Sequence, residues 1–224
     1  MPGVSSIVFA WVTGLAFGLL LSVPIGPVNL TVMNEGAREG FKRAALVGLG
    51  ASVMEVIYCA IAFTGFAGFF AAGSMKTLMG VISFAFITGL GFYYLTRKTV
   101  PSAGGRLGNR IEQRFHPHSA FMTGFVRVMG NPNVLVFWIF LAGYFMAHSW
   151  VEPTWSSKIA CVFGVFCGTG SWFTGLSYAV SLGRSRFSDT TLLRMQRGSG
   201  LGLLVLGLFH GFRIAAHLTK YYRS

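Results

Sequence analysis

Two short motifs place prolines beside side-chain amides within apolar stretches: VPIGPVN at residues 23–29 and GNPN at residues 130–133. Proline removes a backbone hydrogen-bond donor and clashes with the carbonyl group one turn earlier. Each motif therefore predicts a helix break, where freed backbone groups and amide side chains can bind a polar solute. The alternative is a kink that only helps the helices to pack. The predicted solute contacts are Pro24, Gly26, Pro27 and Asn29 in the first motif and Asn131, Pro132 and Asn133 in the second.

Glu55 is the acidic residue that lies well inside an apolar stretch, whereas the other acidic residues fall in polar segments. A carboxylate in the middle of a bilayer costs roughly 2.5–3.5 kcal/mol on insertion scales. We therefore expect Glu55 to be protonated or paired. Either state suits a proton-coupled carrier, because a group that is charged when wet and neutral when enclosed links proton movement to a conformational change. The alternative is a structural carboxyl group that is hydrogen-bonded to a neighbouring helix.

Two further residues are candidates for the same site. Arg127 lies four residues before Asn131 and is the cation predicted to lie at depth. It either extends to the membrane surface or pairs with Glu55 or with a substrate carboxylate, for which its planar guanidinium group is suited. Ser171 lies in a later apolar stretch and is predicted to contact the substrate.

The composition indicates that helices in a membrane position these residues. Hydrophobic residues make up 53% of the chain and charged residues 11%, against about 25% charged residues in soluble proteins. The net charge of +12 resides in short segments between apolar stretches, which is typical of topology signals and not of nucleic-acid binding. Strand-like alternation is absent, so the spans are predicted to be helical.

Six apolar stretches are long enough to cross a hydrocarbon core, which takes about 20 helical residues. The first follows no basic residue, so we interpret it as a retained span and not as a signal peptide. Basic residues concentrate at 38–43, 97–114 and 184–197, while the alternate segments hold only Lys76 and Lys158. This bias places the basic loops in the cytoplasm and the N-terminus outside. The predicted spans are Ile7–Met33, Ala44–Phe70, Leu78–Leu95, Ala120–Ala147, Ile159–Leu182 and Ser199–Leu218.

The two motifs interrupt the first and the fourth spans, three helices apart. An odd number of spans in each half gives the halves opposite orientations. The sequence thus predicts an all-α membrane protein of six transmembrane helices, arranged as two inverted three-helix repeats (1–98 and 120–224) around a basic cytoplasmic loop (99–119). Stripes of small and polar residues support the repeat. They are Gly48, Ser52, Glu55, Cys59 and Ala62 in the second span and Gly164, Gly168, Ser171, Gly175 and Tyr178 in the fifth.

Glycines that recur every four residues within the spans predict close approach of helix backbones in lipid. The pairs are Gly14 and Gly18, Gly164 and Gly168, Gly198 and Gly202, and Gly207 and Gly211.

The order of these motifs resembles the lysine exporter (LysE/RhtB) family of small bacterial transporters. VPIGPVNL followed by EGAREGFKRAALVGLGA resembles its first two helices, GNPNVLVFW its fourth, and GTGSWFTGLSYAVSL its fifth. The resemblance implies an inner-membrane exporter of amino acids or related metabolites, driven by a proton or cation gradient and often dimeric. Ser171-Trp172 stands where some members hold an acidic residue, which leaves Glu55 as the carboxyl group at depth.

Other functions are less well supported by the residues. A divalent metal exporter of the same superfamily would need several carboxylates, histidines or cysteines converging within the spans. A thiol relay would need a cysteine beside the proline motifs, and a hydrolase would need a nucleophile with a placed base. An assembly subunit without transport activity would leave Glu55 and the paired breaks unexplained. We therefore predict a transporter of a small amino-acid-like solute that is not an enzyme and needs no cofactor, with membrane lipid as its other partner.

Overall fold

The computed structural model describes residues 3–24, 26–66, 73–96, 98, 119–182, 190, 193–205 and 207–208. Every regular element within these ranges is a helix. Residues 193–205 form a helical segment near the end of the described chain. The elements before it are α1 (Val4–Ser22), α2 (Pro27–Glu39), α3 (Phe41–Ile61), the π-helical turn η1 (Ala62–Phe66), α5 (Gly73–Thr96), α7 (Ala120–Met129), α8 (Pro132–Ala147) and α9 (Trp155–Ser181).

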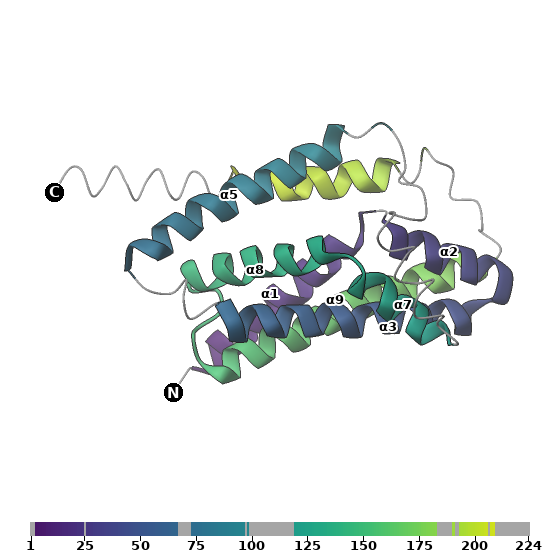
Figure 1. The fold of residues 1–224 in the computed structure, drawn as a ribbon, viewed down its shortest axis with the longest axis horizontal. Helices are drawn as coiled ribbons and strands as arrows, with labels where there is room; N and C mark the ends of the chain where they lie inside the picture. Colours follow the sequence, from purple (N-terminus) through teal and green to yellow (C-terminus); the bar gives the residue numbers. More distant parts are fainter. Residues whose placement is uncertain are drawn as a thin grey trace.

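The long helices run along the longest axis of the molecule (Figure 1). α1 packs mainly on α9, and α3 packs on α7 and α9. α5 lies against α8 and beside the 193–205 segment, on one side of the other helices (Figure 1). Large apolar side chains remain exposed on the outer faces, as suits contact with lipid. Examples are Val8, Phe9, Leu49, Ile57, Ile159 and Phe163.

Within the part of the chain that the structure describes, three helices are long and apolar enough to cross a membrane: Val4–Ser22, Phe41–Gly65 and Trp155–Ser181. The bent pair Ala120–Met129 and Pro132–Ala147 provides a fourth span if it is counted as one. The apolar part of α5, Phe84–Thr96, is shorter, and much of the predicted last span, Ser199–Leu218, lies outside the described residues. The described residues thus agree with the predicted helical fold and contain several helices that could span a membrane, whereas six spans and their inverted arrangement stay predictions.

Both proline motifs break their helices as predicted. Pro27 and Pro132 each occupy the first turn of a new helix, where the missing N–H would have had no intrahelical partner. The residues before them, Gly26 and Asn131, leave the helical conformation, with φ of −122° and −116°, as expected before proline. The second break turns the chain by 68° between α7 and α8.

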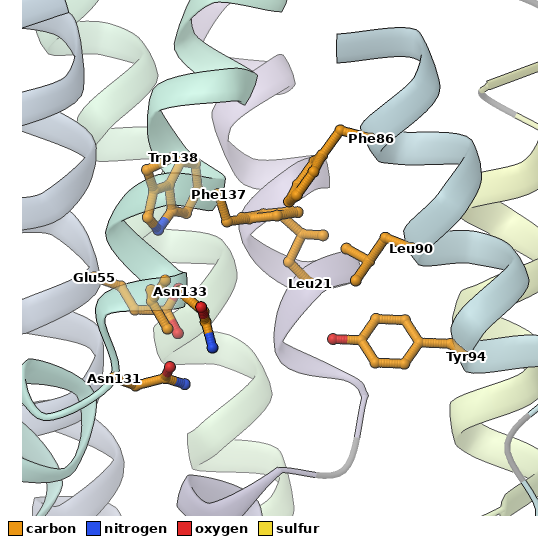
Figure 2. Close-up of a pocket in the computed structure, with 10 residues that line it drawn as sticks. Leu21, Glu55, Phe86, Leu90, Tyr94, Asn131, Asn133, Phe137 and Trp138 are labelled. Atoms are coloured by element: carbon orange, nitrogen blue, oxygen red, sulfur yellow. The ribbon is translucent and has the colours of Figure 1, made fainter. Parts of the chain in front are cut away.

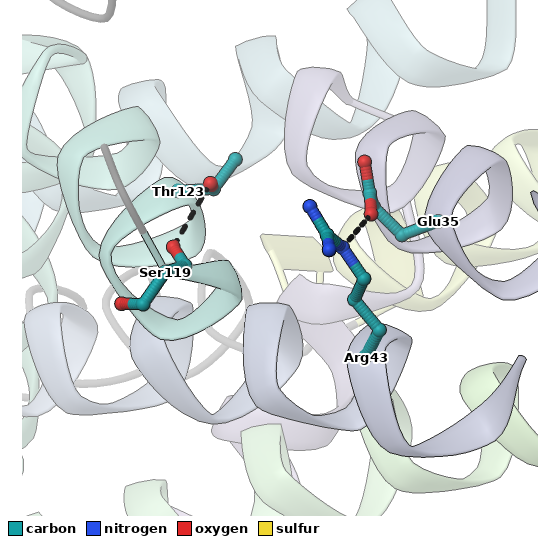
Figure 3. A network of polar contacts seen from close by, with 4 residues as sticks. All are labelled: Glu35, Arg43, Ser119 and Thr123. Atoms are coloured by element: carbon teal, nitrogen blue, oxygen red, sulfur yellow. Dashed lines mark hydrogen bonds and ion pairs between the residues drawn. The ribbon is translucent and has the colours of Figure 1, made fainter. Parts of the chain in front are cut away.

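The segment after the first break differs from the prediction. The first span was expected to run to Met33 and a basic loop to follow, but α2 continues as a helix to Glu39 and α3 begins at Phe41. Gly40 alone forms the corner, with a positive φ of 82° that glycine adopts without strain. Arg43 Nε donates to Glu35 Oε2 at 2.6 Å across this corner (Figure 3). Glu35 and Glu39 are therefore helical, contrary to the predicted loop.

Within the described residues, glycines bring three pairs of helical segments into backbone contact: α1 with α9, α3 with α7, and α5 with the 193–205 segment. A Cβ atom on Gly14 or Gly18 of α1 would overlap backbone atoms of Cys161 or Val165 of α9. Added Cβ atoms on Gly164 and Gly168 of α9 would in turn meet the backbone of α1, and those on Gly50 of α3 and Gly124 of α7 would meet each other's helix. The predicted close approach of the first two glycine pairs is confirmed. In the last segment, Gly200 packs on Gly91 of α5, while Gly198 faces open space.

The stripe predicted along the fifth span does not form one buried face. Gly164 and Gly168 face α1, but Ser171, Gly175 and Tyr178 are exposed. The reason is that α1 ends at Ser22. Gly168 packs opposite Leu19 near that end, so α1 does not continue over the later part of this face.

Candidate functional site: a cavity at the second helix break

The first break is closed by hydrogen bonds of one side chain. Asn29, which is 3% exposed, donates from Nδ2 to the carbonyl oxygens of Ser22 and Pro24, both at 2.9 Å. Its Oδ1 accepts a bond of 2.9 Å from the indole Nε1 of Trp172 on α9. Both amide hydrogens of Asn29 are therefore used to satisfy carbonyl groups that the proline break releases. Asn29 therefore stabilises the first break by joining the end of α1 to α9.

We expect Asn29→Ala to destabilise the protein by about 1–3 kcal/mol, because it leaves two carbonyl groups and the Trp172 N–H without their partner. Thermal unfolding in detergent would measure this loss. Asn133→Ala is the matched control, since Asn133 is exposed beside the other break and should change the unfolding temperature little. An equal loss of stability in both variants would contradict this stabilising role of Asn29.

The second break is held by a phenol from another helix. The Tyr58 hydroxyl group of α3 donates to the carbonyl oxygen of Met129 at 2.9 Å. Met129 is the last residue of α7, so the chain break removes its usual partner one turn ahead. Tyr58 thus satisfies a carbonyl group at the end of α7, as Asn29 does at the end of α1.

Tyr58→Phe removes this bond while keeping the ring, and we expect it to lower stability by about 0.5–1.5 kcal/mol. Tyr178→Phe, on the exposed face of α9, is the matched control and should have no measurable effect. Chemical or thermal unfolding of the two purified variants would compare them. A Tyr58 variant as stable as the wild type would show that water replaces the phenol at Met129.

A cavity of about 180 Å³ opens beside the second break. It lies between α1, α3, α5 and the first turns of α8 (Figure 2). Figure 2 shows Glu55, Asn131 and Asn133 together on one side, with the Tyr94 hydroxyl group pointing in from α5. Apolar side chains occupy the rest of the wall. The lining residues are Leu21, Glu55, Phe86, Leu90, Tyr94, Asn131, Asn133, Val134, Phe137 and Trp138.

Glu55 is the ionisable carboxyl group of this cavity. The part of the lining that the structure describes contains no Lys, Arg or His. The Trp138 indole, which is 1% exposed, directs its nitrogen toward Glu55 (Figure 2) without meeting the geometry of a full hydrogen bond. Ser52, one turn before Glu55, is fully buried, and its hydroxyl group has no partner among the described residues. The carboxyl group therefore has the Trp138 indole beside it and lines the open cavity.

The structure brings together only some of the predicted site residues. Glu55, Asn131 and Asn133 line the cavity, whereas Pro24, Gly26, Pro27 and Pro132 shape the two breaks without being among the described lining residues. Arg127 is half-buried on α7 and Ser171 is exposed on α9, and neither lines the cavity within the described chain. The Ser171 hydroxyl group instead donates to the Gly168 carbonyl oxygen of its own helix at 2.8 Å.

The α5 residues of the cavity were not predicted. Phe86, Leu90 and Tyr94 follow one another at four-residue spacing, which places them on one face of a helix. Nothing in this apolar pattern distinguishes a cavity wall from ordinary packing. The tyrosine hydroxyl group near the end of the stretch was the one available signal.

Known proteins resemble the chain over most of its length. The chain is 26% identical over 203 residues to a Bacillus subtilis protein named "Putative amino acid efflux protein YcgF", covering 89% of this chain and 93% of that one. No solved structure matches the chain. The family model of the LysE type translocator matches residues 19–212, which include both helix breaks and every residue that lines the cavity. The chain therefore belongs to the LysE type translocator family.

Proposed function

We propose that the protein is a secondary transporter that exports an amino acid or a similar small metabolite across the bacterial cytoplasmic membrane, coupled to the proton gradient. The observation that carries the proposal is the cavity at the α7–α8 break, with one carboxyl group and two amides inside a bundle of apolar helices. The name of the Bacillus subtilis relative, "Putative amino acid efflux protein YcgF", supports the substrate class.

Glu55 provides the coupling in this proposal. A bare carboxylate costs several kcal/mol to enclose away from water. The cavity therefore closes on one side of the membrane and opens on the other most easily when the charge of Glu55 is neutralised. When the cavity turns from the outside to the cytoplasm, a proton from outside neutralises Glu55. When the cavity turns outward with substrate bound, a cationic group of the substrate neutralises it. One carboxyl group then exchanges one proton for one substrate molecule.

The proposed topology follows the sequence. Six spans in two inverted halves (1–98 and 120–224), with the N-terminus outside and the basic segments in the cytoplasm, would place the cavity between the halves. In Figure 1, α1, α3, α5, the α7–α8 pair and α9 run alternately in opposite directions, which supports this arrangement. The homodimer that the family resemblance implies is also a prediction.

Reconstituted vesicles would test the function. Proteoliposomes loaded with labelled amino acids should release them faster when the outside is made acidic, and a protonophore should cancel this difference. Release that ignores the proton gradient would contradict the coupling, and no release of any amino acid would contradict the substrate class. Efflux of manganese or cadmium would favour the metal-exporter alternative, although the described residues hold no group of three His, Cys, Asp or Glu that could bind a metal ion.

A further inference from the structure

The cavity holds one carboxyl group, and two asparagine side chains line it at the start of α8. We propose that it selects a neutral α-amino acid with an apolar side chain, with the ammonium group at Glu55, the carboxylate group at the N-terminus of α8 and the side chain against the wall formed by Leu21, Phe86, Leu90 and Phe137. This inference rests on the proposed function and adds the substrate class to it.

The N-terminus of α8 is the place for the carboxylate group. A helix of 16 residues carries a partial positive charge at its start, where backbone N–H groups lack intrahelical partners. Val134 donates its N–H to the Asn131 carbonyl oxygen at 3.0 Å, while the Asn133 N–H has no such bond within the described chain. The side-chain amides of Asn131 and Asn133 line the same cavity. No basic residue of the described lining offers an alternative.

The Trp138 indole bears on how Glu55 is held in the cavity. Its N–H is buried on α8 and lacks a full hydrogen-bond partner among the described residues. Because the indole nitrogen is directed at Glu55 (Figure 2), it can hold the carboxylate in place while the other carboxylate oxygen receives the ammonium group of the substrate.

The opposite wall determines which side chain fits. The rings of Phe86 and Phe137 lie 5.7 Å apart at 49°, and Leu21 and Leu90 complete an apolar surface beside them (Figure 2). A lysine or arginine side chain would place a second cation against this surface. With Glu55 occupied by the α-ammonium group, the described lining has no second acid for it. A charge that loses water against an apolar surface without a partner is unfavourable, so the wall favours apolar side chains.

Exchange in proteoliposomes would test the selectivity. Vesicles loaded with labelled leucine should release it against external unlabelled leucine or phenylalanine, and at least about tenfold more slowly against lysine or aspartate. Exchange of lysine in preference to leucine would overturn this inference and leave the proposed function standing. Absence of exchange with all four amino acids would instead count against the proposed function.

Two analogues would test the orientation. Leucinamide lacks the carboxylate group and 4-methylpentanoate lacks the ammonium group, so each should exchange at least about tenfold more slowly than leucine. Leucinamide as good as leucine would exclude the α8 site for the carboxylate, and 4-methylpentanoate as good as leucine would exclude Glu55 for the ammonium group.

A designed change of selectivity completes the test. Leu90→Asp adds a carboxyl group to the apolar wall and should raise lysine exchange relative to leucine exchange at least about tenfold, while Leu90→Asn should not. Thermal stabilisation of the wild-type protein by leucine and not by lysine provides a readout that does not depend on the folding of either variant. Equal stabilisation by both amino acids would overturn the proposal.

Discussion

Glu55→Gln is expected to reduce proton-driven export to background while the folded protein stays in the membrane. Glutamine keeps the size of the side chain but can neither release a proton nor carry the negative charge that attracts an ammonium group. Because no basic residue of the described lining depends on Glu55, the change leaves no buried cation unpaired and should cost little stability. Efflux from proteoliposomes with an acidic exterior, together with thermal unfolding in detergent, would measure both effects.

Glu35→Gln is the matched control for this experiment. Glu35 makes an exposed salt bridge with Arg43 at the α2–α3 corner, and such pairs contribute at most about 1 kcal/mol. Export should persist in this variant at near the wild-type rate. If the Glu55 variant exports as fast as the wild type under the same gradient, Glu55 does not couple protons.

Gly164→Ala is expected to disrupt the pairing of α1 and α9. The added methyl group would meet the Trp11 carbonyl oxygen and the Leu15 nitrogen, and these are backbone atoms that cannot move aside without shifting the helix. Overpacking of this kind typically costs 1–3 kcal/mol or more. The expected result is a lower unfolding temperature and less folded protein in the membrane.

Gly175→Ala provides the comparison on the same helix. Gly175 faces open space, so the change should stabilise the helix slightly, by up to about 1 kcal/mol. Unfolding followed by circular dichroism would show opposite signs for the two variants. The same loss in both would mean that α9 needs glycine for a reason other than contact with α1.

The sequence predicted the helix breaks because proline has a local and strong effect on the backbone. Pro27 and Pro132 can start a helix but cannot continue one, whatever surrounds them. Glu55 was identifiable for a similar reason, since a carboxyl group among apolar residues needs a polar environment. Its place beside Asn131 and Asn133 in one cavity agrees with that expectation.

The sequence did not predict the roles that depend on distant partners. Asn29 was predicted to contact a solute, which stays a prediction, and its hydrogen bond with Trp172 could not be foreseen because Trp172 lies 143 residues later in the chain. The role of Tyr58 likewise depends on its hydrogen bond to α7, and that of Tyr94 on its position in the cavity wall. The charges at 35–43 were interpreted as a loop, because polar residues with a glycine resemble one. The chain instead places them on two helices that meet at Gly40.

The glycine contacts also affect how the protein is assembled during synthesis. α1 meets its closest partner in α9 and α3 meets α7, so neither half of the chain fills its own glycine grooves. The N-terminal half leaves the ribosome first. Until the second half is inserted, the glycine faces of α1 and α3 contact lipid and not their partner helices. A nascent chain halted in the 97–118 segment would therefore be poorly packed and a target for membrane proteases until the second half inserts.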